Sequence, residues 1–130
     1  MSLMRQGQVR STPDQMVAGI KWERGSGFNG ALPEEFDIAK VHAFAIFVFD
    51  DAVWCVNEYK DEEFGEILVD GKSLSVEEAR RDATMALLGA CESAQFFQRA
   101  HDGWCLMSDS DMIKDCDETA RLIREAALNT

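Results

Sequence analysis

Three polar side chains in the central apolar part of the chain have the chemistry to orient a ligand. His42 carries an imidazole, Asn57 an amide and Tyr59 a phenol, and all three donate or accept hydrogen bonds. Phe44 and Ile46 follow His42 at intervals of two residues, which is the spacing of one face of a strand. The sequence therefore predicts a groove for a ligand or partner, with an apolar floor and a polar rim. The alternative is a hydrogen-bonded margin of a sheet that binds nothing.

A β-hairpin is expected to position these residues. The run 41–49 is almost entirely apolar, and the segment 52–59 follows it after Asp50-Asp51, a pair that suits a short turn. A strand with one wet face alternates apolar and polar residues, so this run indicates cover on both faces. A two-residue turn would create a dry face against the main helix, with the five candidate site residues on the other face. The dry face would hold Ala43, Ala45, Phe47, Phe49, Ala52, Trp54 and Val56.

A capping motif and the spacing of apolar residues predict two C-terminal helices. Ser75-Val76-Glu77-Glu78 matches a capping box, which predicts a helix to about Ala100. Its apolar stripe is Ala79, Ala83, Ala86, Leu87, Ala90, Ala94 and Phe97. A last helix is expected from about Ser110 to Leu128. A third strand is expected over 64–69, followed by a turn at Asp70-Gly71.

The N-terminal third has two competing interpretations. Gly25-Ser26-Gly27 is typical of a turn, which favours a hairpin of strands at 17–23 and 28–32, with 33–38 as a connection. A helix from Thr12-Pro13 is the alternative. Residues 1–15 are expected to be flexible, and Met4 indicates that residues 1–3 come from an expression vector.

Residues 16–130 are therefore expected to form a single α+β domain. It should contain an antiparallel sheet of four or five strands packed by two C-terminal α-helices.

The cysteines do not form a recognisable reactive or metal-binding pattern. Cys91, His101, Cys105 and Cys116 match no close-paired zinc spacing. Residues 109–117 have lysine where a calcium loop needs glycine, and a catalytic cysteine would need a base that the sequence does not place beside it. We expect reduced, mostly buried thiols, no catalytic residue, no metal and no cofactor.

The charge balance argues against nucleic acid as a partner. Thirteen Lys and Arg against 24 Asp and Glu give a net charge of −11, which repels phosphate backbones unless basic residues gather in one place. Arg80 and Arg81 would have to contribute to such a basic face. No segment reaches the length of a membrane span, and no export signal core is visible, so we expect a cytoplasmic protein with no membrane contact.

The order of motifs resembles small phage or prophage proteins of unknown function. The resemblance rests on Ile20-Lys21-Trp22, the glycine-rich turn, the apolar hairpin and Ser75-Val76-Glu77-Glu78-Ala79. The hairpin and the helix that follows it are also similar to HicB-like antitoxin domains. Asp70-Gly71-Lys72 stands where that family has a Pro-Gly-rich segment. The resemblance implies a β-meander that is followed by a helix. It implies no catalytic residue.

These observations favour a non-enzymatic protein-interaction module that self-associates as a homodimer, with a further protein partner as a possibility. Two alternatives remain open. One is a small-molecule binder or enzyme that uses His42, Asn57 and Tyr59. The other is a regulator related to phage or toxin–antitoxin systems.

Overall fold

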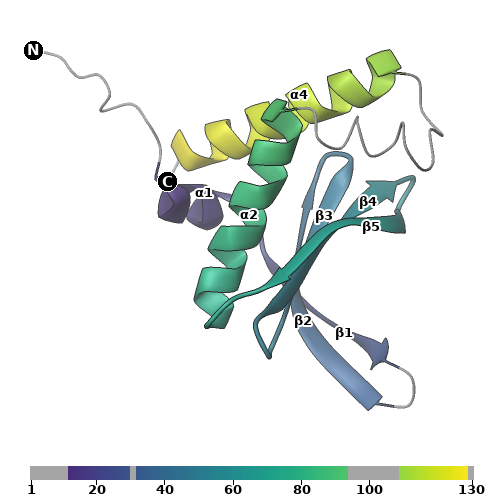
Figure 1. The fold of residues 1–130 in the computed structure, drawn as a ribbon, viewed down its shortest axis with the longest axis vertical. Helices are drawn as coiled ribbons and strands as arrows, with labels where there is room; N and C mark the ends of the chain where they lie inside the picture. Colours follow the sequence, from purple (N-terminus) through teal and green to yellow (C-terminus); the bar gives the residue numbers. More distant parts are fainter. Residues whose placement is uncertain (1–11, 30–31, 94–108, 129–130) are drawn as a thin grey trace, which may run out of the picture.

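The chain forms a five-stranded antiparallel sheet with helices on one side (Figure 1). The computed structural model describes residues 12–29, 32–93 and 109–128. The strands lie in sequence order, each paired with the next along the chain, and this architecture confirms the predicted α+β class. The elements are α1 (Pro13–Gly19), β1 (Glu23–Asn29), β2 (Leu32–Val41), β3 (Phe44–Phe49), β4 (Val53–Lys60), β5 (Glu63–Lys72), α2 (Val76–Ser93) and α4 (Asp109–Leu128).

The face of the sheet that packs against α2, called the inner face below, holds the main core. Phe44, Ile46 and Val48 of β3 are at most 2% exposed, and burial of each such side chain contributes about 1.5–3 kcal/mol. The alanine-rich stripe of α2 is buried, as its spacing predicted, but it lies against these residues and not against the predicted face of Phe47. Small side chains let the helix approach a sheet that carries larger ones. The buried stripe residues are Ala79, Ala83, Leu87 and Ala90.

The turn between β3 and β4 has three residues, whereas two were predicted. The N–H of Ala52 donates to the carbonyl of Phe49 at 2.9 Å, and Ala52 has a φ of 68°. Asp51 stabilises the turn because its side chain accepts a hydrogen bond from the N–H of Val53 at 3.1 Å. The turn therefore includes Ala52, which was predicted to begin the second strand.

This extra turn residue changes the pairing of the two strands. Phe47 lies opposite Cys55, and Val48 lies opposite Trp54, so Phe47 and Trp54 do not share a face, contrary to the predicted two-residue turn. Side chains alternate along a strand, and a shift of one residue moves every side chain of β4 to the other face. The β3 half of the predicted dry face was wrong for this reason: Trp54 and Val56 are in the core as predicted, but they share it with Phe44 and Val48 and not with Phe47.

The N-terminal segment forms a helix and one strand where a hairpin was favoured. Thr12 caps α1: its hydroxyl accepts from the N–H of Gln15 at 3.2 Å, and the Gln15 side chain accepts from the N–H of Thr12 at 2.9 Å. The alternative helix was therefore correct. It begins at Pro13, inside the segment expected to be flexible.

Gly25-Ser26-Gly27 lies inside β1 instead of forming a turn. A Cβ on Gly25 would come within 2.6 Å of the ring of Phe36 on β2, so glycine is needed where this ring crosses the neighbouring strand. The predicted connection at 33–38 was wrong, since these residues belong to β2. The predicted turn at Asp70-Gly71 was also wrong: both residues lie in β5.

The last helix closes the core against the first one. Ile123 and Ala127 of α4 are buried, as is Met16 of α1, and α4 begins within one residue of its predicted start. Gly19 lets the two helices touch, because a Cβ there would lie 2.3 Å from the carbonyl oxygen of Ala126. The predicted continuation of α2 to Ala100 lies outside the described residues. Within the described ranges, no helix is both long enough and apolar enough to cross a membrane.

Gly19→Ala should lower the free energy of unfolding by about 2 kcal/mol, because the new methyl group meets a backbone carbonyl that cannot yield. Gly89→Ala is the matched control. Gly89 is exposed on α2 with nothing within 4 Å of an added Cβ, and the change should stabilise the protein by up to about 1 kcal/mol. Urea unfolding followed by circular dichroism measures both. Equal effects of the two substitutions would contradict the close contact of α1 with α4.

Candidate interaction face

The face of the sheet opposite α2, called the outer face below, carries a cluster of aromatic rings. Phe36 of β2 packs edge-on against Phe47 of β3, with ring centroids 5.3 Å apart, and against Phe49 at 5.7 Å. Phe64 of β5 contacts Phe47 at 5.1 Å and Tyr59 of β4 at 5.2 Å. Ring pairs at these separations attract beyond simple area burial. The five rings form one connected outer aromatic cluster across four strands.

The outer aromatic cluster is separate from the main core. None of its rings belongs to the core that α2 and α4 close, and the described helices pack on the inner face. Ile38, Ala45 and Cys55 are buried among the larger outer side chains. Phe64 is 47% exposed and Ile67 49% exposed. A contiguous apolar surface thus stays accessible on this side of the described chain, and such surfaces mark contact sites.

Two of the five predicted site residues lie on the outer face. The Asn57 side-chain amide donates to the carbonyl of Gly65 at 3.2 Å, and its oxygen accepts from the thiol of Cys55 at 3.2 Å. Tyr59 packs against Phe64. The side chain of Asn57 therefore stabilises the pairing of β4 with β5. Tyr59 belongs to the outer aromatic cluster.

The other three predicted site residues lie elsewhere, so the five do not form one groove. Phe44 and Ile46 point to the inner face and are buried in the core. His42 lies in the β2–β3 turn with a φ of 53°, and its Nε2 is 3.0 Å from a carboxylate oxygen of Asp115 on α4. The physical reason is the pairing register: side chains assigned to a common face alternate between the two sides of the sheet.

Charged side chains of both signs lie around the outer aromatic cluster. The strand register places Lys40 and Lys72 on the outer face together with three acids, Glu23, Glu34 and Asp70. The ammonium of Lys40 is 5.3 Å from the centre of the Tyr59 ring, which is within range of a cation–π attraction. The outer face is therefore close to neutral, although the whole chain carries −11.

The described thiols are buried and free, as expected. Burial and, secondarily, the negative charge of Asp70 raise the pKa of Cys55 to about 11, so this thiol is protonated at neutral pH. Cys91 of α2 and Cys116 of α4 hydrogen-bond to each other, which raises the pKa of Cys91 and lowers that of Cys116. In the described part of the chain, no three His, Cys, Asp or Glu side chains are arranged to hold a metal ion.

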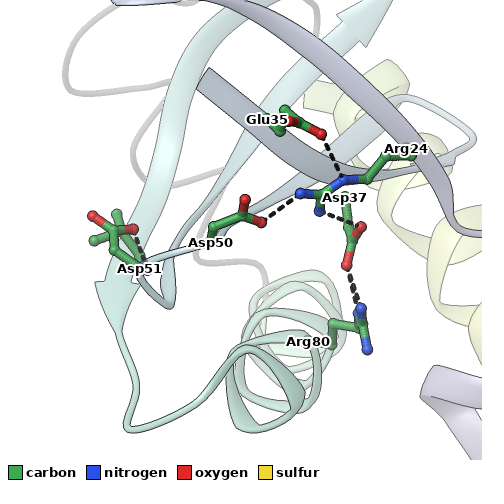
Figure 2. A network of polar contacts seen from close by, with 7 residues as sticks. Arg24, Glu35, Asp37, Asp50, Asp51 and Arg80 are labelled. Carbon is green, nitrogen blue, oxygen red and sulfur yellow. Dashed lines mark hydrogen bonds and ion pairs between the residues drawn. The ribbon is translucent and has the colours of Figure 1, made fainter. Parts of the chain in front are cut away.

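A buried carboxylate ties the sheet to α2 (Figure 2). Asp37 of β2 is 7% exposed. One oxygen accepts from Arg24 of β1 at 3.0 Å, and the other accepts from two nitrogens of Arg80 of α2, from Nε at 2.8 Å. Asp50 of the β3–β4 turn binds the same Arg24 at 2.6 Å. These contacts fix the β1–β2 pair and the turn relative to the helix.

The charge of Asp37 is stabilised despite its burial. Burial acts to raise the pKa of Asp37, but the hydrogen bonds from Arg80 and Arg24 outweigh it and hold this pKa below its ordinary value. Arg81, next in the chain, lies 3.5 Å from a carboxylate oxygen of Asp14. Arg80 and Arg81 are thus both paired with acids instead of forming an open basic face.

Comparisons with known proteins give no relative for this chain. No family model, no curated protein and no solved structure matches it.

Apart from Tyr59, the aromatic residues of the outer face were not predicted as site residues. Phe47 and Phe49 stand two apart, as do Phe36 and Ile38, and this period of two is the signal that could have revealed one apolar face. The signal was missed for Phe36 because its segment was assigned to a connection.

Asp37→Asn should lower the free energy of unfolding by about 2 kcal/mol at pH 7, since hydrogen bonds between charged groups are lost. A carboxylate with a lowered pKa stabilises the fold above the pKa of the unfolded chain, about 4. That contribution is lost as the pH falls through the lower native pKa. The difference between wild type and variant should therefore shrink below about pH 4.

Urea unfolding at pH 7, 4 and 3 measures this effect, with Asp61→Asn in an exposed turn as the control. The control should change stability by less than about 0.5 kcal/mol. A difference for Asp37→Asn that stays constant down to pH 3 would refute the lowered native pKa of Asp37.

Proposed function

We propose that this protein is a non-enzymatic interaction module that self-associates through the outer face of its sheet. The observation that carries the proposal is the outer aromatic cluster, with Phe64 and Ile67 about half exposed. A large apolar surface on one side of a sheet is stabilised when a second apolar surface covers it.

The charge of the outer face supports a second copy of this chain as the occupant. A strongly basic or acidic partner would require a face of the opposite sign, whereas lysines and acids nearly balance around the aromatic rings. The face of one sheet can also pack on the same face of a second copy, since packed sheets lie about 10 Å apart with their side chains interdigitated.

The edges of the sheet are less suited to self-association than its face. Charged residues on edge strands oppose the pairing of one sheet with another. Strand β5 carries four of them, Glu63, Glu66, Asp70 and Lys72. Face-to-face packing is therefore favoured over an extended intermolecular sheet.

The size of the face predicts a weak dimer. Five strands about 4.8 Å apart, each with alternate residues on the face, span on the order of 500 Å². Two copies would bury on the order of 1,000 Å² in total, at the lower limit for specific interfaces. The net charge of −11 on each copy adds repulsion that salt screens. We expect a dissociation constant in the micromolar range that decreases as salt increases.

Sedimentation velocity from about 1 to 500 µM tests the proposal. Wild type should shift from monomer to dimer over this range, and more completely at 500 mM than at 50 mM NaCl. The double variant Phe64→Ser, Ile67→Ser should weaken the dimer at least tenfold, because it removes the two most exposed apolar groups of the face.

Leu74→Ser is the matched control, since Leu74 is 93% exposed and lies outside the sheet, between β5 and α2. It should leave the dimer unchanged, which separates the outer face from exposed apolar surface in general. Wild type that stays monomeric at 500 µM in both salts, or a dimer that the double variant does not weaken, would refute the proposal.

A further inference from the structure

Two thiols from different helices meet in the main core, where α2 packs against α4 (Figure 1). Cys91 of α2 is 5% exposed and Cys116 of α4 is 3% exposed, and their thiols hydrogen-bond to each other. Cys55, the third described cysteine, lies on the outer face and donates to Asn57 instead. Cys91 and Cys116 therefore have the proximity that a disulfide requires, and Cys55 does not.

An ion pair beside the thiols restrains the two helices relative to each other. Arg124 of α4 donates from two nitrogens to the two carboxylate oxygens of Glu92, each at 2.8 Å. Glu92 follows Cys91 directly in the chain. A pair with two parallel hydrogen bonds restrains orientation as well as distance. The last described turn of α2 is thus held on α4 by this pair and by the core, so that a bond between the sulfurs can form by side-chain movement alone.

The two thiols are not equivalent as nucleophiles. The hydrogen bond from Cys91 lowers the pKa of Cys116, and it outweighs burial and the charges of Asp115 and Asp117, which act to raise that pKa. The same hydrogen bond, together with burial, raises the pKa of Cys91. Since the thiolate is the reactive form of cysteine, Cys116 is suited to attack an oxidant and Cys91 to react second.

We propose that Cys91 and Cys116 form an oxidative modification site, which a peroxide converts to an intramolecular disulfide between α2 and α4. The thiolate of Cys116 attacks one peroxide oxygen, so that an S–O bond forms, the O–O bond breaks and the leaving hydroxide takes up a proton as water. The sulfur of Cys91 then attacks the sulfenic acid of Cys116. The S–S bond forms, the S–O bond breaks, and the hydroxide leaves as a second water with the proton of Cys91.

The disulfide would fix the last helix on the core. Ile123 and Ala127 of α4 complete this core, and the bond closes a loop of about 25 residues, which restricts the unfolded chain. Both cysteines lie on the helix side of the sheet, away from the outer face. The proposal is therefore independent of self-association through that face.

Hydrogen peroxide treatment of the folded full chain, followed by alkylation and tryptic peptide mapping without reduction, tests the proposal. Trypsin places the four cysteines in separate peptides, 41–60, 82–99, 100–114 and 115–121. Peptides 82–99 and 115–121 should be recovered as one species, lighter than their sum by about 2 Da for the two hydrogens lost. A reducing agent should separate them. Cys55, which is also buried, is the internal control and should react at least about tenfold more slowly.

Cys91→Ser separates the roles of the two thiols. The serine hydroxyl can still donate to Cys116, but no disulfide can form, so the sulfenic acid at Cys116 should accumulate and react with dimedone. Cys105→Ser is the matched control, and it should leave the yield of the disulfide unchanged. Cys105 lies outside the described residues.

Thermal unfolding shows whether the bond fits the native fold. Oxidised wild type should unfold at least about 5 °C above the reduced protein, and peroxide should produce no such increase in Cys91→Ser. Oxidation of Cys91 and Cys116 no faster than that of Cys55 would overturn the proposal. So would a disulfide that involves Cys105, or a disulfide between Cys91 and Cys116 that lowers the unfolding temperature.

Discussion

The register of β3 against β4 is the constraint on which the rest of the structure depends. Three turn residues, with Ala52 at a φ of 68°, set Val48 opposite Trp54. This pairing puts the branched and large residues of β3 on the side of α2 and directs Phe47 to the other side. A pairing shifted by one residue would send Trp54 out of the core and bring Cys55 into it. The composition of both faces is therefore decided at a single turn.

The helices could be predicted from the sequence because their patterns are long and consistent. The turns could not, because their residues suit more than one turn length. The α+β class, both C-terminal helices and the alanine stripe of α2 follow from long periodic patterns, in which many residues agree. The pairing within the central hairpin does not, since Asp50-Asp51 suits a two-residue turn and a three-residue turn equally. An almost entirely apolar run such as 41–49 has no polar side that could reveal which face is buried.

The turns predicted at two glycines were wrong for a different physical reason. Gly25 and Gly71 occur where an aromatic ring from the adjacent strand lies across the backbone, namely Phe36 and Trp54. A glycine that leaves room for a ring has the same one-letter signature as a glycine that makes a turn. The predicted groove was wrong because residue spacing alone contains no information on long-range pairing. His42, Phe44 and Asn57 were assigned to one face from their spacing, but the folded sheet separates them.

The contact of Gly19 with Ala126 has a consequence for how the molecule assembles. The five strands pair in chain order, so the sheet can form hairpin by hairpin from local contacts. The packing of α1 on α4 joins residues more than a hundred positions apart, and it must wait until α4 has been synthesised. Helix α1 thus reaches its full packing only after α4 has been made, and the core that α4 covers stays incompletely closed in the nascent chain until then.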